Sequence, residues 1–135
     1  IFTYHGIPKR NFTLGDPYQC LCQKTTRLVA AKLGLHENEY ITTFQSRFGP
    51  AEWLKPYTSD TMEELPSLGI KDIMVIAPAF SVDCLETIEE IDQENKEIFM
   101  KAGGNNFEYI PCLNDSQGQI KLIQELLNKH ISVFK

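Results

Sequence analysis

The sequence predicts an α/β domain, an open four-stranded parallel sheet with helices on both faces. Short apolar runs alternate four times with stretches of helical periodicity along the 135 residues. The strongest run covers residues 71–78. It is almost continuously apolar and closes at a proline, as is typical of a buried parallel strand. Helical connections between parallel strands are right-handed and lie against the sheet, so this order of elements places helices on its faces.

The first part of the chain contains a strand, a long helix and a second strand. The strands cover residues 1–5 and 40–44. Between them, Asp16 and Pro17 provide an N-cap and a proline at the first helical position, and Gly34 provides the stop. The helix carries a set of mostly apolar residues on one side: Leu21, Thr25, Leu28, Val29 and Leu33.

Glycine and proline residues divide the middle of the chain. Residues 49–50 and Pro56 mark a structured loop, and a short helix begins at residue 58 or 59. Pro66 bends or ends that helix, because proline lacks the amide that helical hydrogen bonding requires. The strand over residues 71–78 follows.

Two more helices and the fourth strand complete the predicted order. A long helix covers residues 82–102, ends at the glycine pair 103–104, and directs four apolar residues toward the sheet: Leu85, Ile88, Ile91 and Ile98. The fourth strand covers residues 107–111. Asn114 or Asp115 then caps a last helix with an apolar stripe of Ile120, Ile123, Leu127 and Ile131.

Composition and charge exclude several classes of protein. Apolar residues make up 42% of the chain and charged residues 23%, which is ordinary globular composition. The formal net charge of −5 argues against a nucleic-acid partner, which normally meets a basic face. No apolar run approaches the roughly 20 residues that span a bilayer. The chain shows no initiator Met and no signal-peptide pattern, so we expect a fragment of a longer cytoplasmic protein.

The cysteines are too few to suggest a disulfide scaffold. Cys20, Cys22, Cys84 and Cys112 are predicted to be reduced, partly buried residues. Neither a G-x-G-x-x-G motif nor a P-loop occurs, which argues against a nucleotide site.

The carboxyl edge of the predicted sheet is the expected ligand site, because ligands bind there in open α/β sheets. Three segments meet at this edge: residues 5–16, 45–57 and 78–86. His5 ends the first strand and lies within reach of any ligand there. A neutral imidazole can accept a proton or bind a metal near neutral pH, and a structural hydrogen bond is its alternative role.

Carboxylates recur every four residues along the helix predicted over residues 82–102. Glu86, Glu90 and Glu94 form a row on one face, and Asp83 with Glu86 resembles a capping box at the helix start. Like charges at this spacing cost roughly a few tenths of a kcal/mol each. Either a solvated face tolerates this cost, or the row collects a divalent cation, since such cations favour carboxylate oxygens.

Aromatic residues gather at the same edge: Tyr18, Trp53, Tyr57 and Phe80. Such a wall suits a flat apolar ligand with a few polar contacts. Arg47 lies in the same loop as Trp53, where it could pair with an anionic substituent or form a structural ion pair.

Four motifs together resemble the ferrochelatase family. They are Tyr4-His-Gly-Ile-Pro8, Gly15-Asp-Pro-Tyr18, Gln45-Ser-Arg-Phe-Gly49 with Trp53, and Ala79-Phe-x-x-Asp-Cys-Leu-Glu86-Thr-x-x-Glu90. The resemblance covers nearly the whole chain in the right order and matches the C-terminal half of that enzyme. It implies that residues 1–135 form one of two similar flavodoxin-like domains with a porphyrin cleft between them, the N-terminal domain lying outside this chain.

The resemblance also implies roles for individual residues. His5 and Glu86 match the catalytic pair, which binds the metal or takes protons from the pyrrole nitrogens, and Glu90 and Glu94 match a relay for metal or protons. Residues matching the porphyrin cleft or its neighbourhood are Tyr18, Trp53, Phe80 and Asp83. Cys84 departs from family members that have histidine at this position.

The implied reaction is that of a lyase, the insertion of Fe²⁺ into protoporphyrin IX in the last step of haem biosynthesis. The form of the first motif resembles the bacterial protoporphyrin branch. Alternatives are a coproporphyrin-type enzyme, a chelatase for another metal and tetrapyrrole, and a domain that binds metal or porphyrin without catalysis. Iron is a substrate here, no cofactor is required, and an iron–sulfur cluster is not expected because the chain lacks a cysteine-rich tail. The expected partners are porphyrin, ferrous iron, the protein's own N-terminal domain and, peripherally, a membrane surface.

Overall fold

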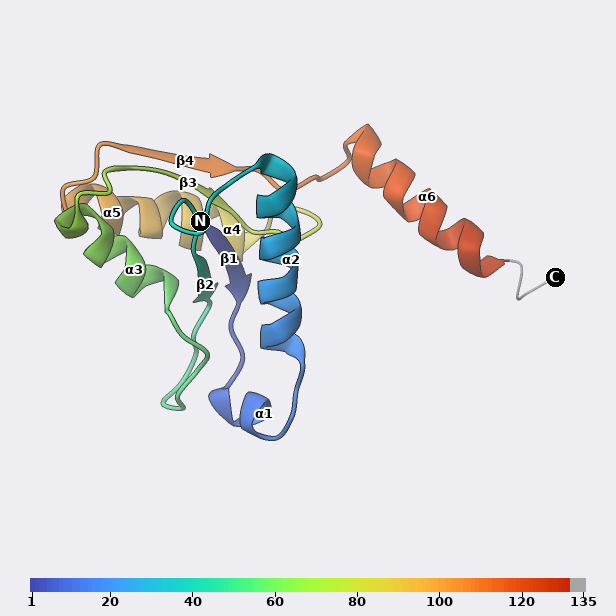
Figure 1. The fold of residues 1–135 in the computed structure, drawn as a ribbon, viewed down its shortest axis with the longest axis horizontal. Helices are drawn as coiled ribbons and strands as arrows, with labels where there is room; N and C mark the ends of the chain where they lie inside the picture. Colours follow the sequence, from blue (N-terminus) through green and yellow to red (C-terminus); the bar gives the residue numbers. More distant parts are fainter. Residues whose placement is uncertain (132–135) are drawn as a thin grey trace.

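The four predicted strands form one sheet in the computed structural model, which describes residues 1–131. They are β1 (Phe2–His5), β2 (Thr42–Gln45), β3 (Asp72–Ile76) and β4 (Asn106–Ile110). All neighbouring strands are parallel, in the order β2-β1-β3-β4 (Figure 1). The predicted open parallel sheet is therefore confirmed. Because the order reverses direction between β1 and β3, the carboxyl ends of these two strands flank the point where such sheets bind ligands.

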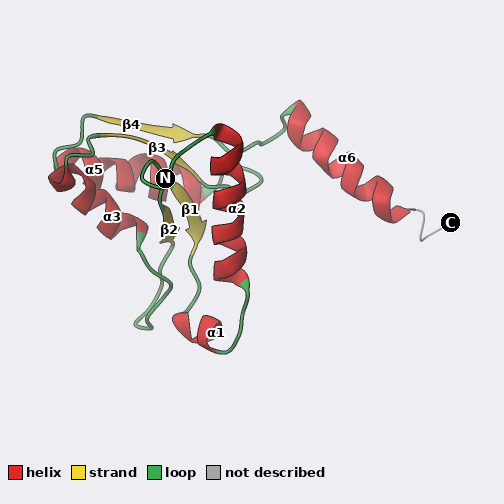
Figure 2. Ribbon diagram, viewed as in Figure 1, coloured by secondary structure: helices red, strands yellow, loops and turns green. Residues whose placement is uncertain are grey.

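The remaining elements connect and flank these strands (Figure 2). They are α1 (Lys9–Thr13), α2 (Tyr18–Leu33), α3 (Thr58–Glu64), the 3₁₀ turn η1 (Leu65–Leu68), α4 (Leu85–Ile88), the π-helical segment η2 (Glu90–Asn95), α5 (Lys96–Lys101) and α6 (Gln117–Ile131). Pro66 lies inside η1, so α3 gives way to a tighter turn at the predicted place.

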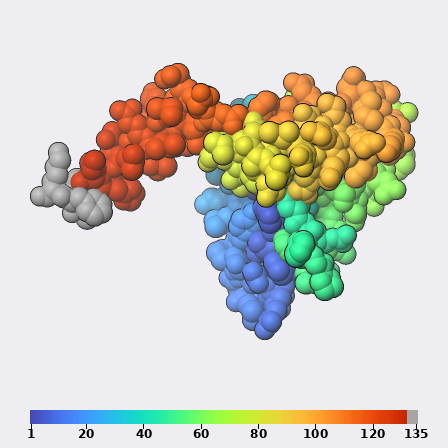
Figure 3. All heavy atoms as spheres, turned by 180° about the vertical axis from the view of Figure 1, so that it is seen from behind, coloured from blue at the N-terminus to red at the C-terminus, as the bar shows by residue number. Residues whose placement is uncertain are grey.

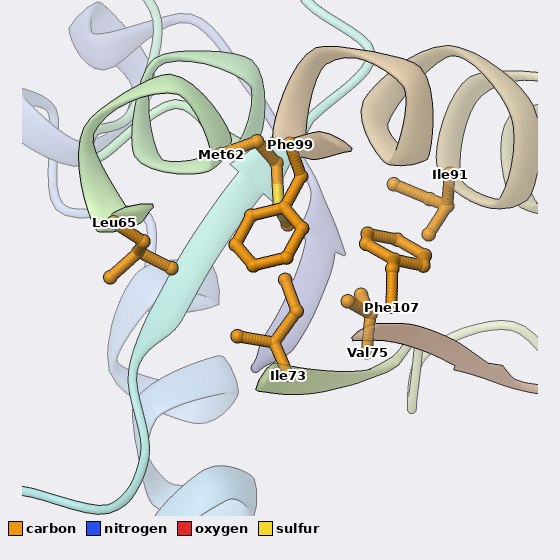
Figure 4. Close-up of a cluster of buried hydrophobic side chains, with 7 residues drawn as sticks. All are labelled: Met62, Leu65, Ile73, Val75, Ile91, Phe99 and Phe107. Carbon is orange, nitrogen blue, oxygen red and sulfur yellow. The ribbon is translucent and has the colours of Figure 1, made fainter. Parts of the chain in front are cut away.

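Each face of the sheet has its own core. On one face, α3, η2 and α5 pack on the strands around side chains that converge in Figure 4: Met62, Leu65, Ile73, Val75, Ile91, Phe99 and Phe107. On the other face, α2 packs on β1 and β2 around Phe2, Tyr4, Cys22, Phe44 and Leu54. Helices thus lie on both faces, as predicted.

Helix α2 begins one residue later than predicted, with Pro17 in place of Asp16 as its N-cap, and it turns a different side to the sheet. The Asp16 carboxylate accepts a hydrogen bond from the Tyr18 amide at 2.9 Å, and Gly34 ends the helix at a φ of 71°. The predicted apolar side is largely exposed, Leu28 by 59%. The buried side carries Cys22, Thr26 and Ala30, whose small size lets the helix approach the strands closely.

The single long helix predicted over residues 82–102 is wrong. The structure has α4, η2 and α5 in its place, and the Glu94 amide bonds to the carbonyl of Glu89, five residues back, at 2.9 Å. A π turn accommodates an extra residue and changes which side chains face the sheet. Ile91 is buried and Ile98 packs against the core, whereas the other two residues predicted to face the sheet, Leu85 and Ile88, are exposed.

Two apolar surfaces remain uncovered within residues 1–131. Helix α6 projects away from the rest of the fold (Figures 1 and 3), and its predicted stripe is exposed, Leu127 by 61%. Beside α2, a groove of about 730 Å³ runs over β3 and is lined largely by apolar residues, among them Val29, Leu33, Ile70, Met74 and Ile110. The cap of α6 also differs from the prediction, because Ser116 Oγ accepts the hydrogen bond from the Gln119 amide. No helix among the described residues is long and apolar enough to cross a membrane.

Candidate active site

His5 is the half-buried last residue of β1 and points to the face opposite α2. Tyr4 packs toward α2, so the alternation of a strand turns His5 the other way. In the parallel register His5 lies beside Gln45, the last residue of β2. Its Nδ1 lies 2.7 Å from the carbonyl oxygen of Gly6. Because a carbonyl can only accept a hydrogen bond, Nδ1 is the donor, and Nε2 is the nitrogen left to bind a metal or take a proton.

Two aromatic side chains flank His5. The Tyr18 hydroxyl donates a hydrogen bond to the carbonyl of His5 at 2.8 Å. Burial, and then the neighbouring Cys22, raise the pKa of Tyr18 above its usual value, so this hydroxyl stays protonated. The Trp53 ring centroid lies 6.2 Å from that of His5. Gly6 permits this approach, because a Cβ there would lie 3.0 Å from the Trp53 ring.

Glu86 lies in the first turn of α4, half-buried and within electrostatic reach of His5. Hydrogen bonds from the Cys84 thiol and from its own amide lower the pKa of the Glu86 carboxyl, and the nearby His5 lowers it further. The site therefore combines an imidazole with a carboxylate that is ionised at neutral pH.

The N-cap of α4 differs by one residue from the predicted capping box. Cys84, not Asp83, is the N-cap, and Thr87 is the third helical residue. The Cys84 amide donates to Thr87 Oγ1 at 2.9 Å. The Glu86 side chain is consequently not used for capping and remains available to the site.

Gln45 fixes α4 relative to the sheet. Its side chain is buried, and Nε2 donates to the main-chain carbonyl of Glu86 at 2.6 Å. Its Oε1 accepts a hydrogen bond from Thr3 Oγ1 at 2.9 Å. Since Gln45 is also the register partner of His5, one residue relates the positions of both candidate catalytic side chains.

Glu90 anchors the loop that follows β2. Its carboxylate accepts hydrogen bonds from the Ser46 amide at 2.6 Å and from the Ser46 hydroxyl at 2.5 Å. Ser46 has a φ of 61°, an uncommon value for a residue other than glycine, and these two bonds hold it there. Glu90 is therefore not part of a merely solvated face.

Glu90 and Glu94 line a polar cavity of about 200 Å³ next to this loop. Asn95, also in its wall, is 3% exposed and donates to the carbonyl of Glu90 at 2.6 Å. Its buried Oδ1 has no partner among the described residues. The predicted row of carboxylates is thus divided, with Glu86 near His5 and the other two at the cavity.

Asp83 is engaged by the protein itself. Its two carboxylate oxygens accept hydrogen bonds from Tyr109 Oη at 2.7 Å, Asn114 Nδ2 at 2.7 Å, Thr87 Oγ1 at 3.2 Å and the Cys112 amide at 3.2 Å. Its predicted role in binding porphyrin stays a prediction, but these contacts point to a positioning role instead.

The other aromatic candidates lie in the two loops beside His5. Phe80 is half-buried in the connection from β3 to α4. Tyr57 is buried, and the Arg47 guanidinium lies 4.5 Å from its ring centroid. Arg47 therefore makes a cation–π contact, which was neither of the predicted alternatives.

A protein-family model described as Ferrochelatase matches residues 1–131. The chain belongs to the ferrochelatase family. It is 55% identical over 131 residues to Ferrochelatase 2 of Shewanella oneidensis, covering 97% of this chain and 40% of that protein. It is 56% identical over 131 residues to the ferrochelatase of Pseudoalteromonas atlantica, covering 97% of this chain and 36% of that protein. With the ferrochelatase of Yersinia enterocolitica the identity is 50% over 132 residues, 98% of this chain and 41% of that protein.

The chain spans about two fifths of the length of these ferrochelatase relatives. Iron is a substrate in this family rather than a resident cofactor. Among residues 1–131, no three or more His, Cys, Asp or Glu side chains are grouped to hold a metal ion. His5 and Glu86 can therefore supply at most part of a coordination sphere.

Sequence reasoning missed Gln45, Ser46 and Asn114, which contact residues of the candidate site. Gln45 and Ser46 lie in one of the four motifs, which was the available signal for them. For Asn114 the sequence predicts only a helix cap, because its contact with Asp83 spans 31 residues. No local pattern marks such a partner.

Proposed function

We propose that this chain is the C-terminal domain of a bacterial protoporphyrin ferrochelatase, a lyase that inserts Fe²⁺ into protoporphyrin IX. Family membership supports the type of reaction. The observation that carries the assignment to this site is that Gln45, the register partner of His5, donates to the main-chain carbonyl of Glu86 and so brings the two residues to the same carboxyl edge of the sheet. The coproporphyrin-type reaction is the alternative.

The side chains of His5 and Glu86 suit the chemistry of metal insertion. Metal insertion must remove protons from the pyrrole nitrogens while the metal exchanges water for porphyrin nitrogen. Nε2 of His5 can accept a proton or bind the ion, and the charged Glu86 offsets the positive charge that accumulates there. Tyr18 binds the main chain of His5, Trp53 lies beside its imidazole, and both provide apolar surface for a macrocycle.

A second domain completes the proposed cleft. The relatives are more than twice as long as this chain, and the groove over β3 and the exposed stripe of α6 offer apolar surface for further packing. The isolated chain would hold one wall of the cleft and is therefore expected to be inactive alone. We further propose that the full-length enzyme is cytoplasmic and contacts a membrane peripherally.

The choice of porphyrin tests the proposed branch. Full-length protein is supplied with reduced iron and either protoporphyrin IX or coproporphyrin III, and insertion is followed by porphyrin absorption. A higher kcat/KM for protoporphyrin supports the proposal. A higher value for coproporphyrin would assign the protein to the other branch.

Glu90→Gln in the full-length enzyme tests the proposed relay. Gln retains the size of the side chain and can still accept from the Ser46 amide, so the loop should keep its conformation. Loss of the charge beside the cavity should raise the KM for iron about fivefold, the equivalent of roughly 1 kcal/mol, while the KM for porphyrin changes little. Glu97→Gln is the matched control, because Glu97 pairs with Lys101 at the surface. An unchanged KM for iron would remove Glu90 from the relay.

A further inference from the structure

A clamp of hydrogen bonds joins the loop before α4 to the connection between β4 and α6. The Asp83 amide donates to Asn114 Oδ1 at 2.8 Å, and Asn114 Nδ2 donates to Asp83 Oδ2 at 2.7 Å. The Asn114 amide also donates to the carbonyl of Ser81 at 3.0 Å. We call the reciprocal pair the Asp83–Asn114 clamp.

Further donors hold the Asp83 end of the clamp. Tyr109 Oη and the Cys112 amide both donate to Asp83 Oδ1. Burial opposes the charged form of Asp83, but hydrogen bonds from Asn114, Tyr109 and Cys112 outweigh it and hold the pKa of this carboxyl well below its usual range. Asp83 is therefore a fixed anion whose orientation is set by β4 and the connection that follows it.

The clamp continues to Glu86 through two short contacts. Thr87, which is fully buried, lies with Oγ1 3.2 Å from Asp83 Oδ1 and accepts from the Cys84 amide at 2.9 Å. The Cys84 side chain in turn accepts from the main chain of Thr87, so the two residues cap α4 reciprocally, and Glu86 lies between them in the first turn. The series Asn114, Asp83, Thr87 and Cys84 thus connects the far loop to the first turn of α4, which carries the candidate catalytic carboxylate of Glu86.

Asparagine at position 114 satisfies two structural requirements, one of the backbone and one of the side chain. Asn114 has a φ of 50°, in the left-handed region that asparagine tolerates better than most residues. Its amide group also provides both the donor and the acceptor that the reciprocal pair requires. Glycine at position 114 would adopt the positive φ but could not form the side-chain hydrogen bonds of the clamp. A glycine substitution therefore tests the hydrogen bonds separately from the backbone conformation.

We propose that Asn114 is a positioning residue for Glu86, which it holds through Asp83 and the first turn of α4. This inference rests on the proposed function of Glu86 in metal insertion.

Asn114→Gly in the full-length enzyme tests this role. At a temperature well below unfolding, kcat for iron insertion should fall about tenfold, with the KM for porphyrin unchanged. In a Glu86→Gln background the same substitution should change kcat by less than about twofold, because Asn114 then has no carboxylate to position. Asp115→Gly, at the exposed neighbouring position, should retain wild-type kcat.

A measurement that does not depend on activity completes the test. Hydrogen exchange of the amides of residues 84–88 should accelerate about tenfold in Asn114→Gly and stay unchanged in Asp115→Gly. Wild-type kcat, an undiminished effect in the Glu86→Gln background, or unchanged exchange would each overturn the inference. Absence of iron insertion by the wild-type protein would count against the proposed function instead, and the exchange result would still decide whether the clamp holds α4.

Discussion

Replacing His5 by alanine in the full-length enzyme is expected to reduce the rate of iron insertion by about a hundredfold or more. The substitution removes Nε2, the one imidazole nitrogen not committed to the Gly6 carbonyl. The measurement is the initial rate of porphyrin fluorescence loss with saturating reduced iron.

The His5→Ala variant should remain folded. His5 is half-buried at the end of β1, and its side chain makes a single hydrogen bond, to the adjoining residue. Its unfolding midpoint should therefore lie close to that of the wild type. His36→Ala is the matched control, because His36 is exposed and its hydrogen bonds use the main chain. Wild-type turnover by folded His5→Ala would remove His5 from the mechanism.

Glu86→Gln should lower kcat about 10- to 100-fold. The substitution keeps the size of the side chain and the main-chain carbonyl that binds Gln45, but it removes the negative charge near His5. Because the pKa of Glu86 lies below its usual value, the wild-type residue is ionised throughout the neutral range. The deficit should therefore be constant from about pH 6 to about pH 8 and shrink only in more acidic solution, where wild-type Glu86 becomes protonated.

Glu89→Gln provides the control for this second substitution. Glu89 lies at the end of the same short helix and is exposed, so its loss of charge should leave kcat unchanged. A deficit in Glu86→Gln that grows steadily with pH across the neutral range would contradict an already ionised Glu86. Equal effects of the two substitutions would show a general charge effect on iron rather than a role for Glu86.

The strands and the limits of α2, to within one residue, could be predicted because their signals are local. Asp16 and Gly34 act within one turn of the ends of α2, and the apolar run over residues 71–78 contains β3. The buried side of α2 could not be predicted from hydropathy. Thr26 Oγ1 accepts a hydrogen bond from Thr42 Oγ1 at 3.0 Å and forms another with Tyr4 Oη at 3.0 Å, and so a polar residue occupies the sheet-facing position.

The π-helical segment η2 also could not be predicted from the spacing of apolar residues. A regular helix and a helix with one wide turn have the same apolar residues in the same order. What distinguishes them is Asn95, whose side chain binds the carbonyl of Glu90 inside the protein at 2.6 Å. That contact depends on burial among α3, β2 and α5, which periodicity does not represent.

The candidate site, too, could be predicted only in part from the sequence. His5 could be placed at the sheet edge from strand position, and the family motifs supplied Glu86 as its partner. The resemblance did not reveal the contacts that fix the pair, because Gln45 reaches Glu86 across 41 residues and Asn114 reaches Asp83 across 31. Both contacts depend on which strands become neighbours in the fold.

Iron insertion by the wild-type full-length protein tests the central claim most directly. The protein is mixed anaerobically with reduced iron and protoporphyrin IX, and the loss of porphyrin fluorescence is recorded against protein concentration. We expect a rate proportional to protein concentration, reduced about a hundredfold or more in His5→Ala and retained in His36→Ala. Folded protein that leaves the fluorescence of both protoporphyrin and coproporphyrin unchanged would contradict the assignment of this domain to a ferrochelatase reaction.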